Sequence, residues 1–348
     1  MITTHRYTAI FYHFIILSYI NMVFYACDSH VTDDVPSMAE TPTNVGNTPN
    51  LNKADEQSNS TEIIVPENCA FDADDPYEPR SRFTHGPWLG ACHDTRKRRP
   101  VYQLEDSIAQ QYQDVEGWTA LANIYHADGF WIAFVPNDAL ETVFFQLEYF
   151  PAVIPAGHTQ LRLKYEEPIL LYGQSTHVLG QVDYTHDLVL SIEAVTQVGD
   201  RYDLFKGTQE HFSIAYRVTT LQARYHSMIT LQNHHVEQWV LDLEPEEKQE
   251  LLATYVANSS GFSLKYAYHT LFRNCTTEII EILDQVVKYT WGEQVKKFLV
   301  KVTEIYPNIV RAALVARGLM PFDKSNDWFA LEEDKEFIEQ LSQDAQSE

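Results

Sequence analysis

Short segments in the middle of the chain either alternate apolar and polar residues or are continuously apolar. Such patterns are typical of β-strands that are half or fully buried in a sheet. The predicted strands are residues 130–135, 142–150, 159–165, 169–172, 187–194 and 212–219. Residues 224–232 continue the β pattern towards residues 239–243, so we predict β structure there as well.

Helical spacing appears on both sides of these strands. Pro245 and the acidic residues beside it favour a helix start, because proline fits the first turn and carboxylates favour the positive end of the helix dipole. Apolar residues recur at i, i+3, i+4 and i+7 after Cys275, and Asn274 can cap that helix. The other predicted helical regions are residues 103–125, 293–317 and 327–341. Helices, then strands, then helices predict an α+β fold.

The N-terminus predicts export and a tether. An apolar stretch of residues 7–26 follows His5 and Arg6, as in a secretory signal. The small residue Ala26 directly before Cys27 resembles a bacterial lipoprotein processing site, at which the cysteine receives a lipid. An uncleaved signal anchor is the alternative, because the stretch is long enough to span a bilayer. Both interpretations place the remainder outside the cytoplasm, tethered to a membrane.

Composition divides the chain further. Residues 28–66 are polar and acidic with almost no aromatic residues, which predicts a disordered tether because such a segment cannot bury enough apolar surface to fold. The predicted division is a signal or anchor segment at 1–27, the tether at 28–66, an α+β domain at 67–325 and an acidic tail at 326–348.

The balance of charge limits the possible partners. The chain has 49 acidic and 25 basic residues and a formal net charge of -24, so its surface repels nucleic acid. Four histidines that could suggest a metal site, His211, His226, His234 and His235, lack a tight ligand spacing such as H-E-x-x-H. We therefore expect no nucleic-acid partner, no metal and no other cofactor.

The four cysteines have different predicted roles. If Cys27 carries a lipid, then Cys69 and Cys92 are natural disulfide partners in an oxidising compartment, because they are close in sequence. Cys275 is then left as a free thiol exposed to oxidation, which indicates a reactive residue. A different pairing and a buried, inert thiol are the alternatives.

Cys275 also has the setting of a nucleophile. It lies where the aromatic, strand-like segment 264–272 passes into a helix, and a helix N-terminus lowers the pKa of a thiol. A thiol nucleophile needs a base, usually histidine. His158 follows Gly157 at the start of a predicted strand, where its ring would be held rigidly at a strand end. By itself this position also fits a structural histidine.

Three segments carry a family resemblance. The sequence Gly157-His158-Thr159, the stretch 222–251 and the sequence Asn274-Cys275-Thr276-Thr277 resemble, in that order, the Lnb N-terminal periplasmic domain family over about residues 130–287. That family is similar to circularly permuted NlpC-type papain-like hydrolases and to the lecithin retinol acyltransferase group, in which the histidine strand precedes the cysteine helix. The resemblance implies a permuted papain-like core of antiparallel strands, with the cysteine at a helix N-terminus and extra helices at both ends.

The resemblance also implies a chemistry. Cys275 would be the nucleophile and His158 the general base of an enzyme that forms a thioester with an acyl group and passes it to water or an amine. The implied substrate is a membrane lipid or a lipoprotein, on the periplasmic side of the bacterial envelope. Because the chain lacks the multi-span portion that Lnb carries after its soluble domain, an envelope hydrolase or transferase acting on an acyl or amide group is the broader expectation. The alternatives are a peptidoglycan-directed cysteine amidase or peptidase and a non-catalytic binding domain.

Supporting roles fall on a few polar residues. Gln174 and Glu166 are candidates to orient the base. The backbone N–H of Cys275 is placed to hold an oxyanion, and Asn274 either contributes to the site or only caps the helix. Arg162 shares the face of the histidine if the strand is regular, so it either lines the cleft or forms a surface ion pair.

Overall fold

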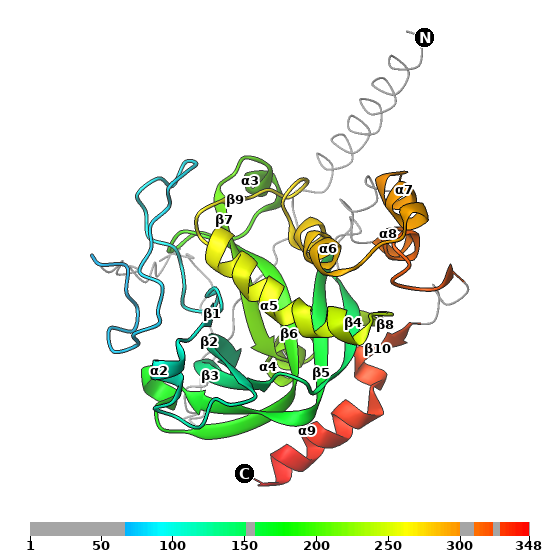
Figure 1. Cartoon of the computed structure of the whole chain (residues 1–348). Coiled ribbons are helices and arrows are strands. Elements are labelled where there is room, and N and C mark those ends of the chain that lie inside the picture. Colours follow the sequence, from blue (N-terminus) through cyan, green and yellow to red (C-terminus); the bar gives the residue numbers. More distant parts are fainter. Residues whose placement is uncertain (1–66, 151–156, 300–309, 323–327, 348) are drawn as a thin grey trace, which may run out of the picture. The chain divides into compact units, whose positions relative to one another are not determined.

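The structure is a computed structural model that describes residues 67–150, 157–299, 310–322 and 328–347 (Figure 1). These residues belong to one compact unit, Val65–Glu348. The predicted signal or anchor segment with Cys27 and the predicted tether lie outside the described residues. Within the described ranges, no helix is both long and apolar enough to cross a membrane.

The strands of the described residues form one sheet. They are β1 Tyr102–Gln103, β2 Trp118–His126, β3 Gly129–Pro136, β4 Leu140–Tyr149, β5 Gly157–Gly173, β6 Val182–Val195, β7 Phe212–Thr220, β8 His235–Val240, β9 Ala267–Tyr268 and β10 Phe329–Ala330. All six strands predicted from the mid-chain pattern are present, and segments 159–165 and 169–172 form the single long strand β5. The α+β class is confirmed.

The sheet closes on itself through the long strand β5. The first part of β5 pairs with β4 and the second part with β3, while β6 pairs with β5 along both parts. The pairings β2–β3, β3–β5, β5–β6, β6–β7 and β7–β2 therefore form a closed ring of strands. All of them are antiparallel except β2 with β7. β4, β8 and β10 extend the sheet beyond the ring.

Helices cover both faces of this sheet. They are α2 Asp106–Ala109, α3 Leu204–Thr208, α4 Leu221–Tyr225, α5 Pro245–Phe262, α6 Cys275–Val286, α7 Trp291–Leu299, α8 Val310–Ala316 and α9 Lys335–Ser347, with the π-helical turn η2 His226–Leu231 and the 3-10 turns η1 Thr176–Val178 and η6 Leu331–Glu333. The predicted helices at Pro245 and Cys275 are confirmed. Figure 1 shows α5 passing in front of β6 and β5.

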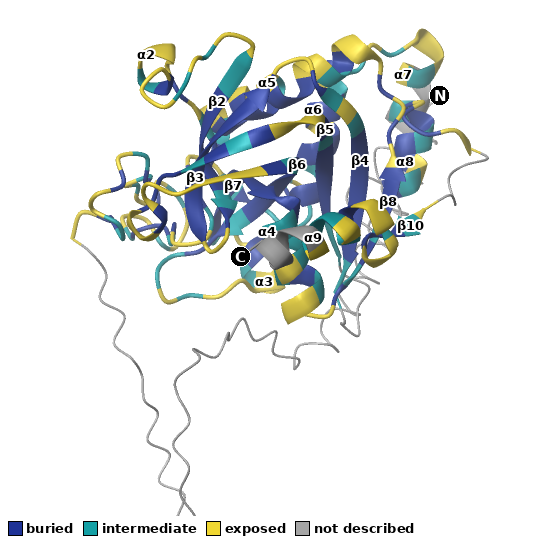
Figure 2. Ribbon diagram, turned by 90° about the horizontal axis from the view of Figure 1, so that it is seen from below, coloured by how far each residue is buried: buried dark blue, intermediate teal, exposed yellow. Residues whose placement is uncertain are grey.

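The two faces of β5 differ in chemistry. Leu161 and Leu163 point to the main apolar core, where they pack with residues of α5 and α6. Gln160 and Arg162 point to the opposite face, which α4, η2 and α9 cover, and both are fully buried. Figure 2 shows β4, β5 and β6 as largely buried strands. The sheet therefore has one apolar buried face and one polar buried face at β5.

Two of the predicted elements are wrong, and a third is shorter than expected. Residues 103–125, expected to be helical, contain the one-turn helix α2 and the strand β2, whose residues 120–124 are buried on both faces and so show no alternation. Residues 224–232, expected to be β, form the end of α4 and η2, where Met228 is buried against Val189. In 264–272 only Ala267–Tyr268 pairs with β7.

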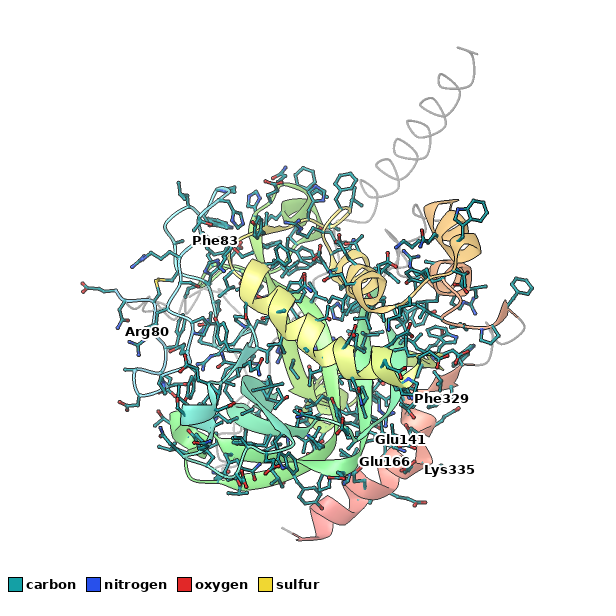
Figure 3. The ribbon with its side chains drawn as sticks, viewed as in Figure 1. Arg80, Phe83, Glu141, Glu166, Phe329 and Lys335 are labelled. Atoms are coloured by element: carbon teal, nitrogen blue, oxygen red, sulfur yellow. A yellow bond between two sulfur atoms is a disulfide. The ribbon has the colours of Figure 1, made fainter. Side chains whose placement is uncertain are left out.

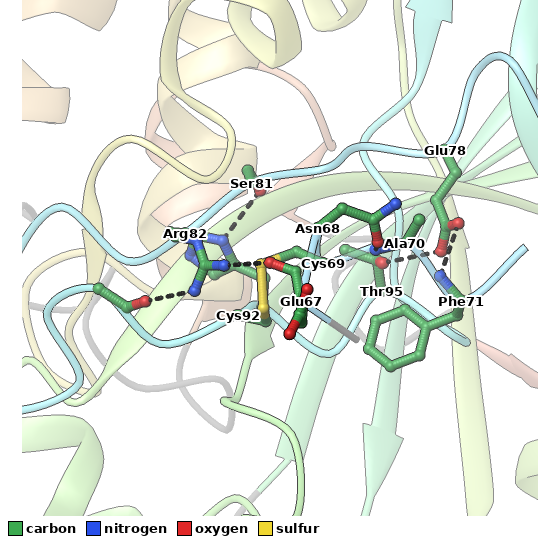
Figure 4. The surroundings of a disulfide bond; sticks show 12 residues. Glu67, Asn68, Cys69, Ala70, Phe71, Glu78, Ser81, Arg82, Cys92 and Thr95 are labelled. Atoms are coloured by element: carbon green, nitrogen blue, oxygen red, sulfur yellow. Dashed lines mark hydrogen bonds between the residues drawn. A yellow bond between two sulfur atoms is a disulfide. The ribbon is translucent and has the colours of Figure 1, made fainter. Parts of the chain in front are cut away.

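The predicted disulfide between Cys69 and Cys92 is confirmed, with its Cα atoms 5.3 Å apart (Figure 4). It ties together a segment with little regular structure, in which Ser81 hydrogen-bonds to His93 at 2.9 Å and Arg82 donates to the carbonyl of Gly90 at 2.9 Å. Cys275 is the free cysteine of the described part of the chain, and it is buried.

Removing the disulfide should destabilise the domain. It closes a loop between residues 23 apart in the sequence, so the variant Cys69→Ala/Cys92→Ala should lose about 3 kcal/mol of unfolding free energy. Denaturant titration followed by tryptophan fluorescence measures the loss, and reduction of the parent protein should give a similar shift. Coincident unfolding curves for parent and variant would contradict the prediction.

Candidate active site

Cys275 is fixed at the first position of α6 by a capping box around Asn274. The side-chain oxygen of Asn274 accepts hydrogen bonds from the backbone N–H of Thr276 at 2.8 Å and of Thr277 at 3.0 Å. The Thr277 hydroxyl accepts one from the backbone N–H of Asn274 at 2.9 Å. Asn274 also donates from Nδ2 to the carbonyl of Thr270 at 2.7 Å. Both polar atoms of this side chain are thus engaged in holding the start of the helix.

Loss of this cap gives a test that separates its structural role from a catalytic one. Asn274→Ala should lower the unfolding free energy by about 1 kcal/mol, because two backbone donors lose their acceptor. Asn274→Ser, which can still cap, should recover most of that loss and should leave the rate of Cys275 alkylation by iodoacetamide unchanged. A large fall in that rate with serine would instead assign Asn274 a direct part in thiol chemistry.

The structure brings His158 to Cys275. Burial opposes the thiolate, but attraction and a hydrogen bond from His158 lower the pKa of Cys275 from 9.0 to about 7. Burial likewise opposes the imidazolium, but the interaction with Cys275 raises the pKa of His158 above 6.5. The two shifts favour a thiolate–imidazolium pair near neutral pH.

Neighbouring hydroxyl groups complete the surroundings of the sulfur. The backbone and the side chain of Thr159 lower the pKa of Cys275 further. The Thr159 hydroxyl also donates to that of Thr276 at 3.2 Å, which joins the start of β5 to the first turn of α6. Cys275 is only 5% exposed. The thiol therefore lies in a largely enclosed site, where electrostatic interactions are strong.

Two buried carboxylates flank His158 on the polar face of the sheet. Glu148 of β4 is the register partner of His158. Gln160 pairs with Ser191 of β6, which places Glu193 beside His158 on the other side. The negative charge of each carboxylate attracts the imidazolium, so both carboxylates favour the charged form of His158. The row Glu148–His158–Glu193 thus crosses three neighbouring strands.

Arg224 of α4 holds this row together. Its guanidinium contacts Glu148 at 2.9 Å and Glu193 at 3.6 Å and donates to Gln160 at 2.8 Å. Burial would raise the pKa of both carboxyl groups, but Arg224, together with other basic groups, holds that of Glu148 below 4.5 and that of Glu193 well below it. His234 adds a 2.6 Å contact from Nδ1 to Glu148. Both carboxylates therefore stay ionised next to the imidazole.

No described residue hydrogen-bonds to Nε2 of His158, although this nitrogen is buried. Glu193 favours the charged imidazole of His158, whereas Arg224 opposes it.

The structure does not bring Gln174 or Glu166 to His158. Gln174 follows the other end of β5, where its side chain donates to Asp75 at 3.1 Å and to Asn123 at 2.7 Å. Glu166 is an exposed residue of β5, and Figure 3 shows it at the end of the sheet away from α6. Gln174 and Glu166 therefore both lie away from His158 and cannot orient its ring.

Arg162 shares the face of β5 with His158, as the alternation predicts, but it lines no cleft. It is 2% exposed and contacts Asp187 at 2.7 Å and Asp334 at 2.5 Å. The ion pair is therefore buried instead of on the surface. Among the histidines considered for a metal, His234 binds Glu148 and His235 contacts Glu332 at 2.7 Å. In the described ranges, no cluster of three or more potential ligands could hold a metal ion.

The family follows from the sequence of this same region. Residues 128–306, more than half of the chain, match the family model described as the Lnb N-terminal periplasmic domain. The chain belongs to this family. The match includes β3 to α7, and therefore Cys275, His158, Glu148, Glu193 and Arg224. No curated protein matches the chain, and no solved structure does. A periplasmic domain of this kind indicates a protein of the cell envelope.

The sequence alone does not indicate that Glu148, Arg224 and Glu193 lie together beside His158. Glu148 and Glu193 occupy predicted strands, but nothing in one sequence aligns these strands with β5. Arg224 lies in a segment that the pattern predicts as β structure but that is helical. The one signal in the sequence is that polar residues such as Glu148 and Glu193 lie in otherwise apolar strands. Polar residues at alternate positions of such strands indicate a buried polar face of the sheet.

Proposed function

We propose that this Lnb-type domain is an envelope thiol enzyme with a circularly permuted papain-like core, in which Cys275 is the nucleophile and His158 the general base. The observation that carries the proposal is the Cys275–His158 pair, with the pKa of the thiol lowered to about 7 at the start of α6. A thiol with this pKa is close to the optimum for nucleophilic attack at neutral pH.

The pair supports acyl transfer in two steps. The thiolate of Cys275 attacks the carbonyl carbon of an ester or amide, and the backbone N–H of Cys275 would help to stabilise the oxyanion. The imidazolium of His158 protonates the leaving alcohol or amine, which leaves a thioester on the sulfur. His158 then removes a proton from water or an amine, which attacks the thioester and restores the thiol.

The proposed substrate is an acyl group of a membrane lipid or lipoprotein, and the proposed membrane anchor is the N-terminal segment 1–27 with Cys27. A domain held at the membrane meets such substrates at high effective concentration. Peptidoglycan stem peptides, cleaved by the same thiol chemistry, are the competing substrate class. A purely binding role would need neither the lowered pKa of Cys275 nor its partner His158.

Intact mass spectrometry tests the proposal directly. The full chain is incubated in parallel with phosphatidylglycerol vesicles, a diacylglyceryl lipopeptide and a muropeptide. An increase by the mass of one fatty acyl group, removable by neutral hydroxylamine and absent in Cys275→Ala, is the expected result with either lipid substrate. An adduct with the muropeptide alone would replace the lipid proposal by the peptidoglycan one. No adduct with any substrate, together with an unreactive Cys275, would leave only a binding role.

A further inference from the structure

Large apolar side chains are exposed at the end of the sheet that carries Cys275. At this end β4 and β6 finish, β5 and β7 begin, and α6 starts. Phe205 is 52% exposed, Phe272 is 69% exposed and Leu204 is 42% exposed. Tyr202 and Tyr266 are exposed as well. We name these five residues the apolar rim.

Two loops that are bonded to each other hold the apolar rim. The backbone N–H of Thr270 donates to the carbonyl of Gly207 at 3.2 Å, and its hydroxyl donates to the carbonyl of Leu204 at 3.2 Å. A Cβ at Gly207 would lie 2.2 Å from the Thr270 hydroxyl, so only glycine permits this approach. α3 and the loop before Cys275 are therefore one unit. The exposed side chains of α3 and Phe272 belong to the same surface.

The apolar rim adjoins the thiol. The rings of Tyr202 and Tyr268 are 6.0 Å apart in an edge-to-face contact. The pKa of Tyr268 is raised well above 10, mainly by burial and also by the neighbouring Tyr202 and Cys275. Asn274 connects the loop to the helix through its bond to Thr270. The apolar rim and the thiol are therefore at the same end of the sheet, joined through Tyr202, Tyr268 and the loop before α6.

The charge of these two loops differs from that of the chain. Residues 200–210 and 264–274 contain four basic residues (Arg201, Lys206, Lys265 and Arg273) and three acidic residues (Asp200, Asp203 and Glu210), which gives a formal charge of +1. Lys206 is paired with Asp200 at 2.6 Å, and Arg273 is paired with Glu278 of α6 at 3.4 Å. The whole chain has 25 basic and 49 acidic residues. An acidic protein is repelled by an anionic membrane, so the least repelled face is one in which basic residues outnumber acidic ones.

We propose that the apolar rim inserts into the headgroup layer of an anionic lipid bilayer, so that Cys275 faces the layer from which an acyl substrate is taken. Phenylalanine and tyrosine favour this layer, and lysine and arginine beside them contact the phosphate groups. This inference rests on the proposed function, because it gives the acyl substrate a route to Cys275. The proposed partner of the apolar rim is therefore a lipid membrane and not a protein.

Site-specific photo-crosslinking tests the inference. The full chain is reconstituted into vesicles of phosphatidylethanolamine and phosphatidylglycerol, with photoreactive benzoylphenylalanine at position 205 or 272. The control carries it at position 179, where Leu179 is also exposed, at 68%, but follows the opposite end of β5. Positions 205 and 272 should label severalfold more lipid than position 179, and less when phosphatidylcholine replaces phosphatidylglycerol. Equal lipid labelling at the three positions, or crosslinks only to protein, would overturn the proposal.

A second measurement separates this inference from the proposed function. The crosslinking is repeated in the Cys275→Ser background, where lipid labelling at 205 and 272 should persist. Phe205→Ser/Phe272→Ser should lose acyl-enzyme formation on vesicles but keep the parent rate of iodoacetamide alkylation. If the acyl-enzyme never forms but labelling persists, the chemistry fails and the membrane surface stands. If the acyl-enzyme forms on vesicles equally well in the double variant, the rim proposal fails and the chemistry stands.

Discussion

Replacing His158 by alanine should reduce the rate of acyl-enzyme formation by about a hundredfold or more, the usual loss when a general base is removed. The reason is that His158 both holds the thiolate and supplies the proton for the leaving group. Burial alone raises the pKa of Cys275, and attraction to His158 is the largest of the effects that lower it. The measurement is the rate of thioester formation by intact mass, with parent and variant at equal concentration.

Alkylation by iodoacetamide gives a second readout that needs no substrate. With a pKa of about 7, about half of Cys275 is thiolate at pH 7, whereas a thiol at 9.0 is only about 1% thiolate. A thiolate of higher pKa is several times more nucleophilic, which offsets part of this difference. The alkylation rate of His158→Ala at pH 7 should therefore be about tenfold below that of the parent. The midpoint of the pH–rate curve should move from near 7 to 9 or above.

His177→Ala is the matched control, because His177 is an exposed histidine beyond the opposite end of β5. It should keep the parent alkylation rate and the parent midpoint. An unchanged midpoint in His158→Ala would show that the helix start, not the imidazole, lowers the pKa of Cys275. Such a result would remove the dyad from the proposed mechanism.

Local patterns were sufficient for the elements that hold Cys275. The capping residue Asn274 and the apolar spacing after it predict α6, and glycine before His158 predicts a strand start; both residues lie where expected. The pairing of Cys69 with Cys92 also follows from spacing and compartment. These predictions depend on contacts between residues close in sequence or on simple counting.

Contacts between distant segments could not be predicted in this way. The pattern predicts two short strands, with Gln174 after the second, but β5 is one strand of 17 residues, and its ends are separated by about 3.3 Å per residue. Burial of β2 on both faces removed the alternation that identifies a strand. The neighbours of His158 across the sheet depend on strand order and register, which a single sequence does not contain.

Arg224→Met should destabilise the domain by about 3–5 kcal/mol, because it leaves two buried carboxylates without their common partner. The loss should depend on pH. In the parent the pKa of Glu148 and of Glu193 lies below 4.5, so the stabilisation is complete above that pH and is lost as pH falls through the lowered values. The variant should therefore be most destabilised near neutral pH and approach the parent in acid, as measured by denaturant titrations at several pH values.

The same variant tests whether Arg224 tunes His158. The positive charge of Arg224 opposes the imidazolium, so its removal should raise the pKa of His158, as followed by NMR of the ring with His158→Ala for assignment. Arg162→Met is the control, since it also breaks a buried ion pair on this face but acts on Asp187 and Asp334. Both variants should lose stability, but only Arg224→Met should move the His158 titration. Equal shifts in both would mean that general loosening of the sheet, and not the Glu148–Arg224–Glu193 charges, determines the state of the imidazole.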